Sequence, residues 1–180
     1  PNPQSPIPNP QSPIPIKINR FRFSNTLSHA PVELENIDWD DKENRKTLVA
    51  KSPTGTFPFL KTTSGILSES HTIENYLAEK YKAELLGQCE MQRAQVRQWI
   101  DFSSFEIYEW SKSLVYPTFW WKQYCKEYAD KSNYRIRDLL KVLDTQLKDK
   151  NYILGDALTL ADASWFNKLK LFSNYISQKI

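Results

Sequence analysis

The stretch Ser52–Tyr81, SPTGTFPFLKTTSGILSESHTIENYLAEKY, decides how this chain folds. It opens with a Ser-Pro-Thr-Gly turn, in which proline pre-sets its own φ and Gly55 adopts its conformation without steric cost. The apolar run Phe57–Leu60 then predicts a short strand. Because Pro58 lacks a ladder donor, this run does not fit a central strand.

A hairpin turn at Thr62–Gly65 joins this strand to the run Ile66-Leu67, and a helix is expected next. Apolar residues recur at i, i+3, i+4 and i+8 from Ile73 to Tyr81, which is the periodicity of an amphipathic helix. Strand, turn, strand and helix together predict a compact αβ unit. The pair Glu69-Ser70 forms a polar corner at the N-terminus of the helix.

The chemistry of this corner suits a ligand that carries a carboxylate and an amine on one carbon. Free backbone N–H groups and the positive end of the helix dipole attract a carboxylate, and Ser70 adds a hydroxyl donor. Glu69 could pair with the amine. Residue types alone favour a simpler interpretation, in which Ser70 is the N-cap and Glu69 complements the helix dipole. Both interpretations stay open at this point.

The motifs in this stretch resemble the second half of the glutathione transferase N-terminal domain. They are Ser52-Pro-Thr-Gly-Thr-Phe-Pro58, Leu67-Ser-Glu-Ser-His-Thr-Ile73 and Tyr76-Leu77. In that family the proline that matches Pro58 is cis, and the preceding residue, here Phe57, offers its backbone to the cysteinyl part of glutathione. The Glu-Ser pair that matches Glu69-Ser70 holds the γ-glutamyl end. The resemblance therefore implies a glutathione-binding set of Phe57, Pro58, Glu69 and Ser70.

The composition is that of an ordinary globular protein, with 180 residues, 40% hydrophobic, 25% charged and a net charge of +3. Lys and Arg are scattered, and no apolar run approaches the roughly 18 residues of a membrane span. The isolated Cys89 and Cys125 suit a reducing compartment, while His29 and His71 lack the neighbours that a metal site needs. We therefore expect a cytoplasmic protein without metal, and without nucleic-acid or membrane partners.

The chain divides into four parts. Residues 1–15 contain the repeat PNPQSPI twice, which predicts an extended or disordered tail, with a recognition arm as the alternative. Residues 16–81 form a thioredoxin-like αβ subdomain, and residues 82–90 form a linker. The resemblance implies that residues 91–180 form a helical subdomain of the glutathione transferase C-terminal type. The predicted fold class is thus α/β plus all-α.

The αβ subdomain departs from the family near its start. Strands are predicted at Ile16–Phe23 and Val32–Asp38, so only Ser24–Pro31 separates them. The family's first helix has about three turns and needs roughly 11 residues, so we expect it to be missing. The family's thiolate-activating residue lies at the start of that helix. Ser24 is a weak candidate for this role, and we predict no catalytic residue.

Helical periodicity predicts two long helices in the second half, at Met91–Trp110 and Asn133–Lys150. The aromatic segment Leu114–Trp121 contains Pro117 and cannot be one regular helix. Phe102 and Phe105 lie on a second face of the first helix, which indicates a packed helix or an interface with a partner. The candidate interface residues are Phe102, Phe105, Trp120 and Trp121.

A folding signal precedes the last helix. Thr159 and Asp162 stand three residues apart, which predicts a capping box with Asp in place of Glu. Thr159 would accept from the Asp162 N–H while the Asp162 side chain reaches back. The helix that follows carries apolar residues around much of its circumference and should be largely buried. These residues are Trp165, Phe166, Leu169, Phe172 and Ile176.

Further stretches resemble the gamma subunit of translation elongation factor 1. They are Ala94–Ile107, Leu114–Phe119, Leu140–Leu147, Tyr152–Gly155 and Leu158–Asp162. The transferase-like domain of that subunit is mainly a scaffold that binds other subunits. The resemblance implies a non-catalytic interaction domain that needs no cofactor and serves assembly of a translation complex. Its partners would be protein subunits of an elongation factor complex, of an aminoacyl-tRNA synthetase complex or of another assembly. An active glutathione S-transferase and an accessory subunit of another large complex are the alternatives. The resemblance also allows glutathione as a ligand and a dimer of the transferase type.

Overall fold

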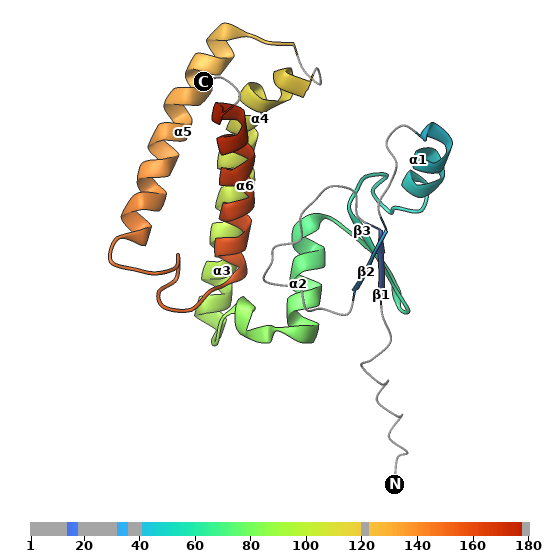
Figure 1. Cartoon of the computed structure of the whole chain (residues 1–180). Helices are drawn as coiled ribbons and strands as arrows, with labels where there is room; N and C mark the ends of the chain where they lie inside the picture. The colour runs from blue at the N-terminus through green and yellow to red at the C-terminus, as the bar shows by residue number, and fades with distance from the viewer. Residues whose placement is uncertain (1–13, 18–31, 36–40, 120–122, 178–180) are drawn as a thin grey trace. The chain divides into compact units, whose positions relative to one another are not determined.

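A mixed sheet of four short strands forms the first part of the molecule (Figure 1). Its strands are β1 (Ile14–Lys17), β2 (Val32–Glu35), β3 (Phe59–Thr62) and β4 (Gly65–Ser68). They lie in the order β2-β1-β3-β4, in which β1 is parallel to β2 and antiparallel to β3, and β3 is antiparallel to β4. This arrangement matches the expected thioredoxin-like subdomain.

The computed structural model describes residues 14–17, 32–35, 41–119 and 123–177. It divides into two units, the first of residues 1–23 and 27–77, the second of residues 24–26 and 78–180. Several predictions lie outside the described residues. These are most of the proline-rich tail, the missing first helix, Ser24, Trp120 and Trp121.

Two strand predictions are corrected by the sheet. The first strand begins at Ile14, inside the predicted tail, because Ile14 pairs with Val32 in the parallel ladder. The third strand lies in the interior of the sheet, although Pro58 argued against a central strand. It begins at Phe59 rather than Phe57, so Pro58 precedes the strand and its missing N–H removes no bond from the ladder.

Two helices accompany the sheet. Helix α1 (Lys42–Val49) begins at the N-cap Asp41, whose Oδ1 accepts a hydrogen bond from the Asn44 N–H at 2.9 Å. Helix α2 (Ser70–Tyr81) follows β4 and buries Ile73, Leu77 and Ala78, as its apolar spacing predicts.

The second unit is helical. Its elements are a 3₁₀ turn (Ala83–Leu86), α3 (Glu90–Phe102), a π-helical segment (Ser103–Tyr108), α4 (Glu109–Val115), a 3₁₀ turn (Tyr116–Phe119), α5 (Lys126–Leu147) and α6 (Leu160–Ser177). Helix α5 begins at Lys126, seven residues before the predicted Asn133. The π-helical segment was not predicted. Among the described residues, no helix has the length and apolar character needed to cross a membrane.

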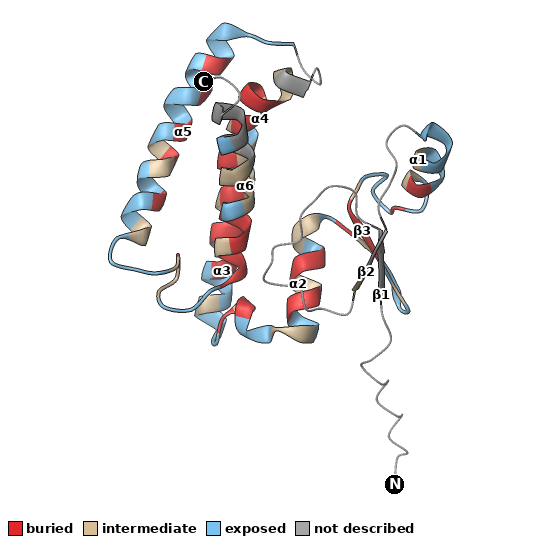
Figure 2. Cartoon of the chain, viewed as in Figure 1, coloured by how far each residue is buried: buried red, intermediate tan, exposed pale blue. Residues whose placement is uncertain are grey.

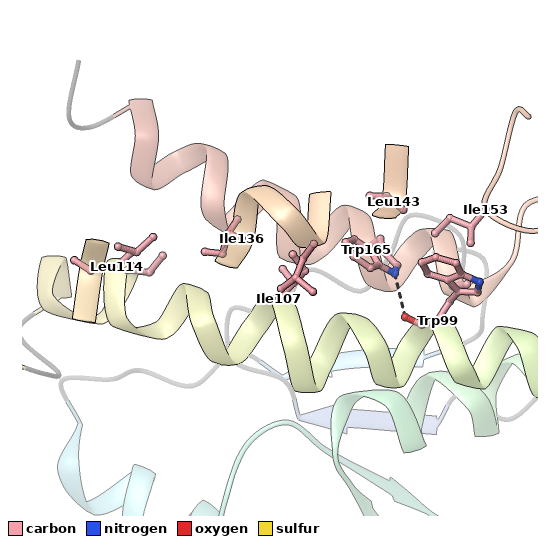
Figure 3. Close-up of a cluster of buried hydrophobic side chains, with 11 residues drawn as sticks. Trp99, Ile107, Leu114, Ile136, Leu143, Ile153 and Trp165 are labelled. Carbon is pink, nitrogen blue, oxygen red and sulfur yellow. Dashed lines mark hydrogen bonds between the residues drawn. The ribbon is translucent and has the colours of Figure 1, made fainter. Parts of the chain in front are cut away.

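Buried residues line the inward sides of these helices, whereas the outer side of α5 is exposed (Figure 2). Their core centres on two tryptophans (Figure 3). The Trp165 side chain is 2% exposed, and its Nε1 donates to the Trp99 carbonyl at 3.0 Å. The two indole rings lie 6.0 Å apart, so apolar burial and one satisfied polar contact join α3 to α6.

The start of α6 differs in detail from the predicted capping box. Asp162 Oδ2 accepts from the Thr159 N–H and from the Thr159 hydroxyl, each at 2.9 Å. The hydroxyl therefore donates to the carboxylate, whereas the prediction had it accept from the Asp162 N–H. Asp162 Oδ1 also accepts from the Ile153 N–H at 2.8 Å, which ties the preceding loop to the helix.

Candidate functional site

The hairpin β3–β4 brings the two predicted binding motifs to one end of the sheet. Phe59 pairs with Ser68 in the antiparallel register, and this is the last pair at that end. Phe57-Pro58 therefore enters the hairpin where Glu69-Ser70 leaves it. The Phe57–Pro58 peptide bond is cis, as predicted. Pro58 is buried, and the half-buried Phe57 ring stacks on Phe59 at 5.7 Å between centroids.

Glu69 adopts a left-handed backbone conformation, with φ of 70°. A residue other than glycine seldom adopts this conformation, which costs about 1–3 kcal/mol and often marks a functional position. The Glu69 side chain is exposed, and its carbonyl accepts the Ile73 N–H at 3.0 Å. Glu69 thus occupies the N-cap position of α2. This corrects the simpler interpretation of the corner, because Ser70 is the first helical residue and not the cap.

The first turn of α2 can receive an anion. The N–H groups of Ser70, His71 and Thr72 belong to the first turn, where helical N–H groups lack partners within the helix, and the Ser70 hydroxyl lies beside them half-buried. A carboxylate is the chemical group that this arrangement fits. The adjacent Glu69 carboxylate adds an acceptor for an amine.

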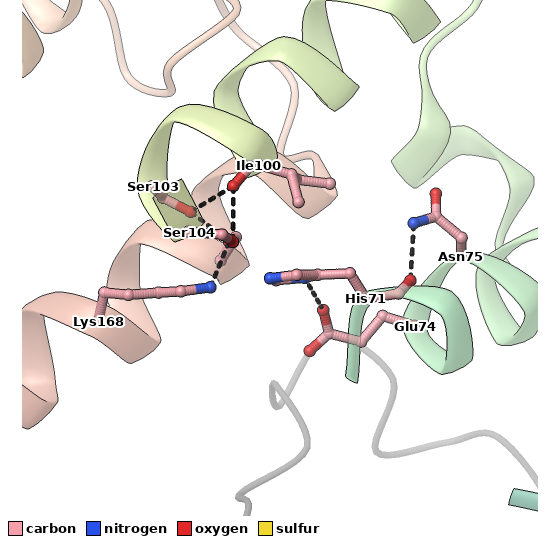
Figure 4. A network of polar contacts seen from close by, with 8 residues as sticks. His71, Glu74, Asn75, Ile100, Ser103, Ser104 and Lys168 are labelled. Atoms are coloured by element: carbon pink, nitrogen blue, oxygen red, sulfur yellow. Dashed lines mark hydrogen bonds and ion pairs between the residues drawn. The ribbon is translucent and has the colours of Figure 1, made fainter. Parts of the chain in front are cut away.

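Side-chain contacts brace the first turn of α2 (Figure 4). His71 Nδ1 lies 3.1 Å from Glu74 Oε2, and Asn75 Nδ2 donates to the His71 carbonyl at 2.7 Å. Glu74 is only 7% exposed, so its carboxylate is fixed in position by this partner. The turn that carries Ser70 is therefore held by contacts that do not involve a ligand.

The helical unit contains its own polar contacts where α3 ends and the π-helical segment begins (Figure 4). The hydroxyls of Ser103 and Ser104 donate to the Ile100 carbonyl at 2.8 and 2.9 Å. Such bonds give a helix carbonyl an alternative partner, which accounts for a local change of helical winding. Sequence periodicity does not reveal this, because the apolar stripe continues through it.

The candidate interface residues lie in different environments. Phe102 packs within the helical unit, with its ring 5.6 Å from Trp99 and 5.7 Å from Trp165. The Phe105 side chain is 71% exposed. Phe166 was expected to be largely buried and is instead 62% exposed, because α6 faces its neighbours with Trp165 and Ala161. Among the described candidates, Phe105 alone offers an exposed ring.

In the part of the chain that the structure describes, no three His, Cys, Asp or Glu side chains group as metal ligands. The described polar groups near Glu69 suit an organic ligand with a carboxylate and an amine.

Two family models match this chain. The model described as "Glutathione S-transferase, N-terminal domain" matches residues 18–85. The model described as "Glutathione S-transferase, C-terminal domain" matches residues 105–176. The two ranges contain the β3–β4 hairpin with α2, and most of the helical unit, respectively.

Several curated proteins are similar in sequence. Elongation factor 1-gamma-A of Xenopus laevis is 34% identical over 113 residues, which are 62% of this chain and 25% of the relative. Probable elongation factor 1-gamma 1 of Arabidopsis thaliana is 31% identical over 130 residues, 71% of this chain and 31% of the relative. Glutathione S-transferase-like protein LUC7 of Fusarium sp is 32% identical over 143 residues, 77% of this chain and 65% of the relative. The chain thus spans about a quarter to a third of these elongation factor relatives.

Solved structures show the same fold. Glutathione transferase F2 from Populus trichocarpa superimposes with a TM-score of 0.76 at 19% identity, over 91% of this chain and 83% of that chain. A Pseudomonas fluorescens pf-5 glutathione transferase family member, described with two glutathione bound, gives a TM-score of 0.73 at 21% identity, over 97% and 83%. At this identity the likeness concerns the fold.

Proposed function

Because this chain belongs to the glutathione S-transferase superfamily, we propose that it is a scaffold domain like that of elongation factor 1-gamma, and that it serves assembly of a translation complex without catalysing conjugation. One observation carries the proposal. The similarity to elongation factor 1-gamma chains, at 31% and 34% identity, extends over 71% and 62% of this chain. Its partners in this role are other protein subunits of the same complex.

An exposed aromatic ring supports the scaffold role. Phe105 is 71% exposed on a helical segment whose neighbour Ile107 is buried, so the backbone that carries the ring is fixed. Aromatic side chains on rigid elements are frequent anchors of protein interfaces. Phe105 is the proposed anchor among the described residues, with Trp120 and Trp121 as further candidates.

The corner at Phe57-Pro58 and Glu69-Ser70 supports binding of glutathione as a ligand. Glutathione carries at its γ-glutamyl end the carboxylate and amine that the helix N-terminus and Glu69 suit. The strained Glu69 is consistent with a binding position, since surroundings must maintain such a conformation. Binding in this proposal occurs without turnover, and no cofactor is required.

An active glutathione S-transferase is the second candidate, favoured by the similarity to the transferase-like protein LUC7. Catalysis would need a donor within hydrogen-bond reach of the glutathione thiol, to lower a thiol pKa that is ordinarily about 8.5. Ser24 is the candidate for that donor. We propose no such role for Ser24, because the similarity to elongation factor 1-gamma favours a scaffold over a transferase.

Affinity purification of the tagged chain from its native source tests the scaffold role. We expect subunits of an elongation factor 1 complex to co-purify in constant ratio, and Phe105→Ala to weaken their retention. Phe166→Ala is the matched control, because it removes a second exposed ring at 62% exposure on another helix. Purification of the chain without any such subunit would contradict the proposal.

A further inference from the structure

A chain of hydroxyl groups links the two segments of the corner. Ser68 Oγ lies 3.1 Å from Ser52 Oγ, which lies 3.4 Å from Thr54 Oγ1. Thr54 Oγ1 lies 2.7 Å from Thr56 Oγ1. Ser68 directly precedes Glu69, and Thr56 directly precedes Phe57. The four hydroxyls thus run from the residue before the glutamate to the residue before the cis peptide bond.

Among these hydroxyl contacts, the one between Ser52 and Ser68 is buried. Ser52 is 7% exposed and Ser68 is 9% exposed. A buried hydroxyl costs free energy unless it has a partner, and the contact between the two serines supplies a buried partner to each. Ser52 is itself held by its backbone, because its N–H donates to Val49 at 3.0 Å and its carbonyl accepts from Gly55 at 3.1 Å. It therefore offers Ser68 a partner in a defined position.

Contacts on both sides of Glu69 in the sequence hold its backbone. On its C-terminal side, its carbonyl accepts the Ile73 N–H and joins the first turn of α2. On its N-terminal side, Ser68 ends β4 with its side chain fixed on Ser52. A left-handed conformation at a residue other than glycine persists only when the surrounding structure determines it. The serine contact supplies that constraint from the strand side.

We propose that Ser52 and Ser68 are positioning residues for ligand binding. Their hydroxyl contact holds Glu69 in the left-handed conformation and keeps the glutamyl-binding corner in register with Phe57. The identity of the ligand rests on the proposed glutathione corner, whereas the conformational role rests on the geometry of this unit alone.

The first test needs no ligand. Backbone chemical shifts of Glu69, measured by NMR, report whether its conformation is left-handed. In the wild-type chain we expect Glu69 chemical shifts that are typical of a left-handed backbone conformation. In both Ser68→Ala and Ser52→Ala we expect these chemical shifts to move toward ordinary extended or helical values. The same left-handed shifts in all three proteins would overturn the proposal.

The second test measures glutathione binding by calorimetry. We expect each single substitution to weaken binding by about tenfold, which is the usual consequence of one lost buried hydrogen bond. The double variant Ser52→Ala/Ser68→Ala should lose no more than either single variant, since both remove one contact. Independent losses that multiply in the double variant would overturn the proposal.

Ser132→Ala is the matched control. Ser132 is fully buried in the helical unit and pairs with the Ser113 hydroxyl at 2.5 Å, so its replacement also breaks a buried serine contact. We expect it to lower stability while leaving glutathione affinity and the Glu69 shifts unchanged. If the wild-type chain binds no glutathione, the proposed ligand is wrong, and the Glu69 shifts still decide the positioning role.

Discussion

The sheet unit and the helical unit both bury pairs of serine hydroxyls, with different consequences. In the helical unit, Ser103 contacts Ser164 and Ser113 contacts Ser132, and each contact joins residues of different helical elements. In the sheet unit, Ser52 and Ser68 join a turn to the end of β4, directly before the strained Glu69. The helical contacts lie beside a large apolar core that already holds their helices. The same chemical group therefore supports packing in one unit and a local conformation in the other.

The largest expected effect is in the core of the helical unit. Trp165→Ala should lower the free energy of unfolding by about 4 kcal/mol, because it leaves a large cavity and removes the donor to the Trp99 carbonyl. Chemical denaturation followed by circular dichroism measures this. Phe166→Ala, at the adjacent exposed position, should cost no more than about 0.5 kcal/mol. Equal losses in the two variants would show that the apolar core does not dominate this unit.

Asp162→Ala comes next, with an expected loss of about 2–3 kcal/mol. The carboxylate accepts from both Thr159 and Ile153, so its removal leaves several donors without their partner. Thr159→Ala should cost only about 1 kcal/mol, as for a lost cap. In a double-mutant cycle measured by denaturation, the two substitutions should cost less together than the sum of the single losses. Additive losses would exclude the proposed coupling between these two side chains.

The structure explains why the larger contribution of Asp162 compared with Thr159 was not predictable from the sequence. Spacing of Thr159 and Asp162 indicated a local cap, and the Asp162 contact to the Thr159 N–H is present. The contact to Ile153 depends on the path of the preceding loop, which no local pattern encodes. Likewise, turn residues and apolar spacing predicted the hairpin and α2 to within a few residues. The strand predicted from Ile16 starts two residues earlier, at Ile14, and this start was missed because Ile14 pairs with Val32, which is distant in sequence.

The corner shows the same limit. The residues around Glu69-Ser70 predicted the N-terminus of α2, and the resemblance to the glutathione transferase family implied the cis bond at Phe57-Pro58. It could not predict the left-handed Glu69, since glutamate has no intrinsic preference for that conformation. The contact of Ser52 with Ser68 joins residues 16 positions apart, so it too emerges only from the fold.

A smaller effect is expected at the cap of α1 in the sheet unit. Asp41→Ala should cost about 1 kcal/mol, because the Asn44 N–H loses its acceptor. Asp41→Asn retains a capping oxygen and serves as the control. Thermal denaturation compares the three proteins. If asparagine were as damaging as alanine, capping would not be the role of this side chain.

The smallest effect appears only at alkaline pH. Burial, followed by the hydrogen bond with Tyr116 at 2.8 Å, raises the pKa of Tyr108. Unfolded tyrosine ionises near pH 10, so stability from this group is complete below that pH and falls as the pH rises further. Tyr108→Phe should therefore flatten the alkaline decline in denaturation measured between about pH 9 and 11. An unchanged slope would contradict the assignment.

The central claim is that this chain has a transferase-like fold that binds protein subunits and glutathione but does not catalyse conjugation of glutathione. The most direct measurement is the initial rate at which it conjugates glutathione to a generic electrophile, with Ser24→Ala compared in parallel. The account predicts the uncatalysed rate for both proteins. Robust turnover by the native chain that Ser24→Ala abolishes would contradict it and establish an active glutathione S-transferase instead.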